Sequence, residues 1–201
     1  ATLTVDANKP TKLPPVLLRW AIVLLLGIGL FANYYVYDSI APLAKTLEQE
    51  LGFSDSAIGT LNAIYSIPNL IMVLLGGLLI DRIGTRKATV IFGAICLLGA
   101  IITAMFGNLL GMAIGRLVFG LGAESMIVAA SAAIAKWFKG KELSFAFAMK
   151  ITLSRVGSFA AENSPSWAGG FYDGWQAPLV LAAAIMAAGV VGCIFYAATE
   201  A

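Results

Sequence analysis

The stretch GGLLIDRIGTRKA, residues 76–88, lies between two long apolar runs of the chain. Asp81 ends the first run, and a cluster of three basic residues precedes the second. Gly84 separates them, and glycine permits a tight turn because it readily adopts a positive φ. The stretch therefore predicts two helices joined by a short charged turn at a membrane surface.

The composition of the whole chain supports this interpretation. Of its 201 residues, 60% are hydrophobic and 12% are charged, whereas soluble domains contain about 25% charged residues. The first residues are polar and lack the short apolar region and cleavage site of a secretory signal. We expect an all-α membrane protein with a cytoplasmic tail over residues 1–15 and a transmembrane bundle over residues 16–199.

Six apolar runs are long enough to cross a membrane, since a spanning helix needs about 20 residues. The predicted spans cover residues 16–38, 56–80, 88–106, 109–138, 143–163 and 175–198. The first is expected to continue as a helix to about Glu50. The connections are short, so consecutive spans should run antiparallel.

Positive charges gather on one side of these predicted spans. Nine Lys and Arg residues flank the spans on the side of the 76–88 turn, against Lys45 alone on the other side. The nine are Lys9, Lys12, Arg19, Arg82, Arg86, Lys87, Lys136, Lys139 and Lys141. Because cytoplasmic loops carry the Lys and Arg excess, both termini are predicted to be cytoplasmic.

The charged turn has a regular pattern, G-x3-D-[RK]-x-G-x-[RK]-[RK]. Its members are Gly77, Asp81, Arg82, Gly84, Arg86 and Lys87. A carboxylate here can hold basic side chains or the positive N-terminal end of a neighbouring helix, so the cluster can lock one conformation and release another. Anchoring by positive charge alone explains the basic residues but neither Asp81 nor the glycines.

This pattern resembles motif A of the major facilitator superfamily in its spacing and in its position after the second span. The stretch GRLVFGLGAES, residues 115–125, also resembles the superfamily's motif B. The resemblance implies six helices that form the N-terminal half of a transporter with a central site between two halves. The implied partner is a second six-helix half, either the C-terminal half of a longer protein or a second copy in a parallel homodimer.

Longer stretches resemble the lysosomal dipeptide uniporter branch of that superfamily. They are residues 115–143, ending in WFKGKEL, MKITLSRVGS at 149–158, YSIPN at 65–69 and YYVYD at 34–38. The short loops favour a bacterial homologue in the inner membrane, with a lysosomal membrane as the alternative.

Two opposite charges are predicted near the middle of the bundle. Glu124 lies thirteen residues before Trp137 and Arg155 twelve after Leu143, which places them ~20 Å and ~18 Å from the same side at about 1.5 Å per residue. Such residues pair with one another or face a cavity. In the second case Glu124 receives a substrate ammonium and Arg155 a carboxylate, which suits a zwitterion. The resemblance implies the same division of roles.

Polar residues on the first two spans form two further sets of candidate substrate-binding residues. Tyr34, Tyr37 and Asp38 share a face of the first span, and Asn62, Tyr65 and Asn69 lie on the second. Hydrogen bonds between helices are the alternative interpretation of both sets. Pro68 should loosen the second span beside Tyr65.

Two other basic residues lie within the predicted spans. Arg116 lies ~31 Å from the cytoplasmic end of its span and is interpreted as a structural or gating residue. Lys150 lies only about 10 Å inside the membrane and is expected to extend its ammonium to the cytoplasmic surface.

The sequence thus predicts a secondary transporter, or its N-terminal half, for dipeptides or similar zwitterions by alternating access. A proton-coupled carrier of organic anions or sugars that uses Glu124 and a non-transporting membrane scaffold subunit remain alternatives. No enzyme activity, metal, cofactor or nucleic-acid partner is expected, because the chain has no His and lacks a metal-ligand cluster and a phosphate-binding loop.

Overall fold

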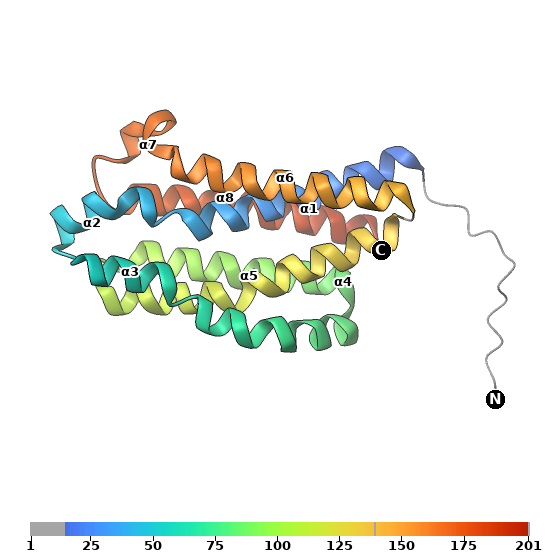
Figure 1. Cartoon of the computed structure of the whole chain (residues 1–201), viewed down its shortest axis with the longest axis horizontal. Coiled ribbons are helices and arrows are strands. Elements are labelled where there is room, and N and C mark those ends of the chain that lie inside the picture. The colour runs from blue at the N-terminus through green and yellow to red at the C-terminus, as the bar shows by residue number, and fades with distance from the viewer. Residues whose placement is uncertain (1–14, 139, 201) are drawn as a thin grey trace, which may run out of the picture.

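The computed structural model describes residues 15–138 and 140–200, which form a bundle of helices without a strand (Figure 1). The helices are α1 Val16–Asp38, α2 Ala44–Leu51, α3 Asp55–Ala63, α4 Ser66–Met105, α5 Leu109–Trp137, α6 Lys141–Glu162, α7 Ser164–Trp167 and α8 Gln176–Thr199, with short 3-10 turns at Ala41–Leu43 and Gly169–Phe171. The predicted all-α class is confirmed for these residues. Residues 1–14 of the predicted tail, and Lys139, lie outside them.

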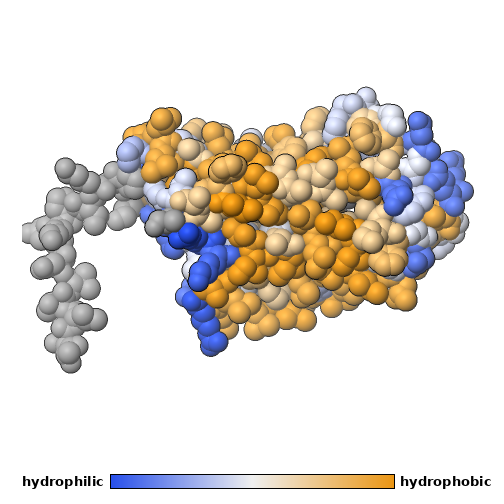
Figure 2. All heavy atoms as spheres, turned by 180° about the vertical axis from the view of Figure 1, so that it is seen from behind, coloured by the Kyte–Doolittle hydropathy of each residue, from blue (hydrophilic) through white to orange (hydrophobic). Residues whose placement is uncertain are grey.

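Four helical segments are long and apolar enough to cross a membrane: Val16–Leu51, Asp55–Met105, Leu109–Trp137 and Gln176–Thr199. On the face seen in Figure 2, hydrophilic residues gather toward the two ends of the bundle, with a broad apolar band between them. This distribution is that of a bundle whose middle lies in hydrocarbon and whose ends meet water.

Helix α4 is two helices joined at Gly84. This residue has φ 79° and ψ 155°, far from helical values, and only glycine adopts this region readily. A Cβ at this position would meet no atom within 4 Å, so the backbone conformation and not crowding requires glycine. The tight turn predicted at Gly84 is confirmed, and the segment Asp55–Met105 contains both predicted spans that flank it.

The predicted second span is itself interrupted. Helix α3 ends at Ala63 and α4 begins at Ser66, so the interruption includes Tyr65, where the loosening by Pro68 was expected. Gly120 of α5 approaches this break closely, because a Cβ there would lie 2.6 Å from Cγ of Pro68 and would also collide with the carbonyl oxygen of Tyr65. Likewise, the expected helical extension to Glu50 is broken by a turn after Asp38, before α2.

The helices form two layers in Figure 1, with α1, α6 and α8 in one and α3, α4 and α5 in the other. The largest buried cluster joins the layers and includes Tyr35, Phe92, Phe119 and Met186. The start of α1, the end of α8 and the bend within α4 lie at one end of the bundle, and α2 and α7 lie at the other (Figure 1). Helix α6 packs mainly on α1 and only slightly on α5, which leaves room for a cavity between α5 and α6.

Candidate functional site

A cavity of about 190 Å³ lies where α1, α4, α5 and α6 meet. It is lined by Tyr34, Tyr37, Asp38, Asn69, Ala123, Glu124, Ile127 and Arg155. Six of the eight predicted substrate-binding residues are among them. Complete ligand pockets usually measure about 300–1,000 Å³, so this cavity is the size of part of a site.

Glu124 and Arg155 line this cavity from α5 and α6 without pairing. Within residues 15–138 and 140–200, no salt bridge includes either of them. The Arg155 guanidinium instead lies 5.6 Å from the centre of the Tyr34 ring, an arrangement that allows a cation–π interaction. The expected similar depth of the two charges agrees with their shared cavity, and the direct ion pair that the sequence left open is absent from the described part of the chain.

Close contacts between helices fix the positions of these two charges. Asn33, fully buried in α1, donates from Nδ2 to the carbonyl oxygen of Ala123 at 3.2 Å, which holds α1 against α5 beside Glu124. Gly157 of α6 lies directly against the backbone of Phe31, which brings α6 onto α1 two residues after Arg155. Sequence reasoning missed Asn33, although an amide inside an apolar run is a signal for such a bond.

Tyr65 and Asn62 are not among the residues that line the cavity. The Tyr65 ring lies behind that of Tyr37, with a centroid distance of 4.4 Å, and is 7% exposed. Asn62 is half-buried on α3. Asn69 does line the cavity, and its buried Oδ1 has no hydrogen-bond partner among the described residues, so it can accept a hydrogen bond from a ligand.

Arg116 is 1% exposed and binds backbone instead of a carboxylate. Its guanidinium donates to the carbonyl oxygens of Val36 and Tyr37 at 2.8 Å each and of Leu61 at 3.1 Å. These carbonyls belong to the last turns of α1 and α3, where helix ends carry partial negative charge, and that of Val36 also accepts from the Ser39 hydroxyl at 2.8 Å. The Tyr65 ring, 4.8 Å from the guanidinium carbon, covers the same cation. Arg116 thus joins two helix ends beside the cavity.

Lys150 does not extend toward the end of the bundle as expected. It is half-buried in α6, and its Nζ donates to Oγ of Ser131 on α5 at 2.6 Å. The bond crosses the gap between α5 and α6. The sequence signal was present, since Ser131 follows Glu124 by seven residues and so lies on the same face of α5.

The residues of the charged turn lie at the end of the bundle. Asp81, Arg82, Arg86 and Lys87 are exposed and Gly77 is partly buried, and in the described chain no salt bridge joins the four charged residues to any other residue. The adjacent Thr85 is instead held by two other helices. Its Oγ1 accepts from Nζ of Lys136 at 2.7 Å and from the hydroxyl of Tyr196 at 3.3 Å.

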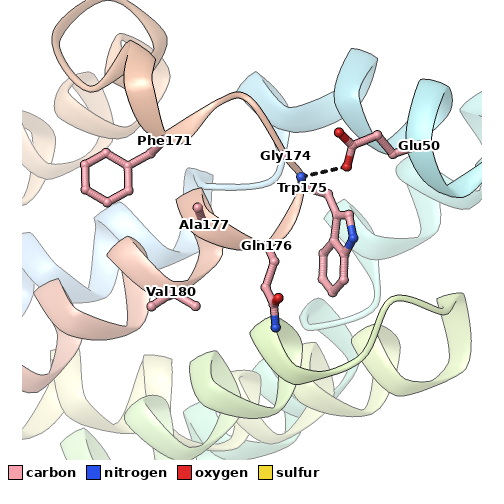
Figure 3. Close-up of a pocket in the computed structure, with 7 residues that line it drawn as sticks. All are labelled: Glu50, Phe171, Gly174, Trp175, Gln176, Ala177 and Val180. Atoms are coloured by element: carbon pink, nitrogen blue, oxygen red, sulfur yellow. Dashed lines mark hydrogen bonds between the residues drawn. The ribbon is translucent and has the colours of Figure 1, made fainter.

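A second cavity, of about 450 Å³, lies at the opposite end of the bundle beside the start of α8 (Figure 3). It is lined by Glu50, Phe171, Gly174, Trp175, Gln176, Ala177 and Val180. Its carboxylate is already engaged, because Oε2 of Glu50 accepts from the backbone N–H of Trp175 at 2.9 Å and so caps α8. Although larger, this open and mostly apolar hollow offers less chemistry than the cavity between Glu124 and Arg155.

Comparisons with known proteins identify the family of the chain. The family model of the Major Facilitator Superfamily matches residues 26–201. The lysosomal dipeptide transporter MFSD1 of Mus musculus is 35% identical over 193 residues, which cover 92% of this chain and 41% of that protein. The hexuronate transporter of Escherichia coli (strain K12) is 28% identical over 168 residues, 84% of this chain and 39% of that protein.

Solved structures show the same fold. A crystal structure of peptide transporter POT in complex with sulfate has a TM-score of 0.75 and 21% sequence identity, covering 86% of this chain and 37% of that one. The chain therefore spans about two fifths of the length of these three proteins. Four of its helical segments are long and apolar enough to cross a membrane, and the chain belongs to the Major Facilitator Superfamily.

Proposed function

We propose that this chain is the N-terminal half of a secondary transporter that moves small zwitterionic solutes, dipeptides in particular. The observation that carries the proposal is a cavity lined by a carboxylate, Glu124, and a guanidinium, Arg155, that are not paired with each other. An isolated charge inside a membrane is costly. A ligand that brings one ammonium and one carboxylate satisfies both side chains at once.

The other lining residues suit the middle of a peptide. The unpartnered Oδ1 of Asn69 can accept from a peptide N–H, and the hydroxyl of Tyr37 can donate to a peptide carbonyl. The names of the relatives agree with this chemistry, since MFSD1 is a dipeptide transporter. Tyr65 would then act from behind the cavity wall, through its contact with the Tyr37 ring.

The proposed arrangement in the membrane has six spans over residues 16–199, with both ends on the cytoplasmic side. The single break of α4 at Gly84 supports it, because two helices joined by a turn cross the membrane twice. The excess of Lys and Arg near this turn gives the orientation. A bacterial inner membrane remains our prediction for the location, with a lysosomal membrane as the alternative that the relatives' name favours.

A second six-helix half is required for alternating access in this proposal. The central cavity is small, and opposite halves of such transporters enclose the site between them. The exposed Asp81, Arg82, Arg86 and Lys87 at the Gly84 turn would form the gating contact with that second half. Gly84 shapes the turn, whereas Gly77 lies in regular helix two turns before it, and Arg116 fixes the helix ends near the cavity.

The decisive experiment is ligand binding with three matched dipeptides. Alanyl-alanine has both charges, N-acetyl-alanyl-alanine lacks the ammonium, and alanyl-alanine amide lacks the carboxylate. Isothermal titration in nanodiscs would measure Kd for the complete transporter that contains this chain. We expect Glu124→Gln to weaken binding of alanyl-alanine and its amide about tenfold or more, and to leave the N-acetyl compound unchanged.

Arg155→Ala should show the complementary pattern. It should weaken binding of alanyl-alanine and of the N-acetyl compound and leave the amide unchanged. Lys45→Met, which removes an exposed charge on α2, is the matched control. If both site variants weakened all three ligands equally, Glu124 and Arg155 would be structural residues and the proposal would be wrong.

A second candidate is a carrier of sugar acids, proton-coupled through Glu124. It is favoured by the hexuronate transporter among the relatives, and Arg155 with the tyrosine hydroxyls would suit a carboxylate and sugar hydroxyls. Binding of glucuronate that is lost in Arg155→Ala and strengthens in Glu124→Gln would support this candidate over the dipeptide one.

A further inference from the structure

A lysine ammonium lies next to the proposed site but outside the set of residues that line it. Lys150 donates to Oγ of Ser131 at 2.6 Å, and Ser131 in turn donates to the carbonyl oxygen of Ile127 at 2.7 Å. Ile127 is a lining residue of the cavity. The ammonium is therefore held one helical turn beyond the cavity wall, on the side of the Gly84 turn.

The nearest carboxylate on the same face of α5 belongs to Glu124. It lies seven residues before Ser131 on the same face of α5, a separation of about 10 Å along the helix. Its half-buried carboxylate accepts no hydrogen bond from the described residues. Lys150 likewise lacks an ionic partner, since no salt bridge of the described chain includes it or Glu124.

The other charges around the carboxylate cannot take this role. Arg155 is directed at the Tyr34 ring, and Arg116 is fixed to backbone carbonyls. Asp38 on α1 is itself negative, and the polar lining residue of α4 is the neutral Asn69. A lysine, by contrast, has a flexible four-carbon stem that lets its ammonium change partner.

Resting on the proposed function, we propose that Lys150 is the resident counter-cation of Glu124. Its ammonium occupies one of two positions. It is hydrogen-bonded to Ser131 when Glu124 is available to a substrate, and it is ion-paired with Glu124 when the site is closed to one. The substrate ammonium and Lys150 compete for the same carboxylate. Ser131 is then a positioning residue, because it sets how often Glu124 is free.

The first test needs no ligand. A carbodiimide condenses a carboxylate with a neighbouring amine into an amide, with loss of water to the reagent. We expect a cross-link between Glu124 and Lys150, identified by mass spectrometry. Its yield should increase at least threefold in Ser131→Ala, because the ammonium then loses its hydrogen-bond acceptor on Ser131. The ion pair between Lys136 and Glu200, with 3.8 Å between its charged atoms, is the positive control in the same sample.

The second test is a double-mutant cycle on the Kd of alanyl-alanine. Ser131→Ala should weaken binding about threefold or more, since Lys150 then occupies Glu124 more often. Lys150→Met should bind at least as tightly as wild type, and Ser131→Ala should have no further effect in its background. In a Lys150→Arg background, Ser131→Ala should again weaken binding, because a cation is present at position 150. N-acetyl-alanyl-alanine should be insensitive throughout.

The outcomes separate this inference from the proposed function. A Glu124–Lys150 cross-link that is absent in both wild type and Ser131→Ala, while the Lys136–Glu200 control reacts, would overturn the inference whatever the substrate is. Equal losses of affinity in Lys150→Met and Ser131→Ala would overturn it too, and would make their bond structural. Absence of any dipeptide binding by wild type would reject the proposed function, and the cross-link would still decide whether Lys150 serves Glu124.

Discussion

Arg116 donates from Nη1 to the carbonyl oxygen of Val36 at 2.8 Å, and so places a fully buried cation at the C-terminal end of α1. The charge is balanced by helix ends and an aromatic face, not by a carboxylate. A cation held in this way does not compete with a substrate for Glu124 or Asp38. The bundle can therefore keep Arg116 beside the cavity while the carboxylates of the cavity stay available.

Removing this cation should destabilise the bundle. In Arg116→Met, three carbonyl oxygens lose a charged donor, and hydrogen bonds to charged groups contribute about 1.5–3 kcal/mol each in favourable cases. We expect a loss of about 3 kcal/mol or more and a Tm lower by roughly 6–12 °C, measured by tryptophan fluorescence in detergent. Arg82→Met, an exposed residue, is the matched control and should leave Tm almost unchanged. An unchanged Tm in Arg116→Met would contradict this account.

Gly84 offers a comparison with a second glycine of the same element. Gly84→Ala forces a side chain into the φ 79° conformation and should cost about 1–3 kcal/mol of stability. Gly77→Ala has equally open space around its Cβ, with no atom within 4 Å. Because Gly77 lies in regular helix, its replacement should be neutral or stabilising by up to about 1 kcal/mol. Equal Tm shifts in the two variants would show that the backbone conformation at Gly84 does not require glycine.

The cation–π pair of Tyr34 and Arg155 can be tested apart from the tyrosine hydroxyl. Tyr34→Phe keeps the ring 5.6 Å from the guanidinium, so the affinity for alanyl-alanine should change by less than about threefold. Tyr34→Leu removes the ring face and should weaken binding about fivefold to tenfold, since such pairs are worth about 0.5–2 kcal/mol. A Tyr34→Phe variant as weak as Tyr34→Leu would mean that the hydroxyl, and not the ring, acts on the ligand.

Much of this arrangement could be predicted from residue spacing. The distance of Glu124 and Arg155 from their helix ends indicated a shared depth, and the i, i+3, i+4 pattern of Tyr34, Tyr37 and Asp38 indicated a shared face. Both rest on helix geometry, which is uniform. The turn at Gly84 could be predicted because few residues other than glycine tolerate its conformation.

Other features depend on contacts that side-chain identity does not encode. Arg116 binds backbone carbonyls, which every residue has, so no sequence pattern marks its partners. The break after Ala63 lies where Gly120 of α5 approaches the backbone of Tyr65 closely, a contact between residues far apart in the chain. The flexible stem of Lys150 can turn toward the surface or toward α5, and although Ser131 marked a possible partner on α5, only the structure shows that the two residues bond.

Asp81 gives the sharpest test of the proposed second half. Its side chain is exposed, and in the described part of the chain it takes part in no salt bridge. Asp81→Asn should therefore change the free energy of unfolding of this chain by no more than an ordinary surface substitution does, about ±0.5 kcal/mol, and leave its Tm almost unchanged. In the complete transporter, the same substitution should remove a charge that holds the positive end of a facing helix.

We expect Asp81→Asn to lower the rate of alanyl-alanine uptake into proteoliposomes about tenfold, with the Kd for the peptide little changed. Asp173→Asn, an exposed aspartate in the loop before α8, is the matched control and should keep the wild-type rate. A large Tm loss in the isolated chain would instead give Asp81 a role within this half. A wild-type rate of uptake by Asp81→Asn would contradict the gating role of the charged turn, because the carboxylate would then be needed neither within this half nor at the contact with the second.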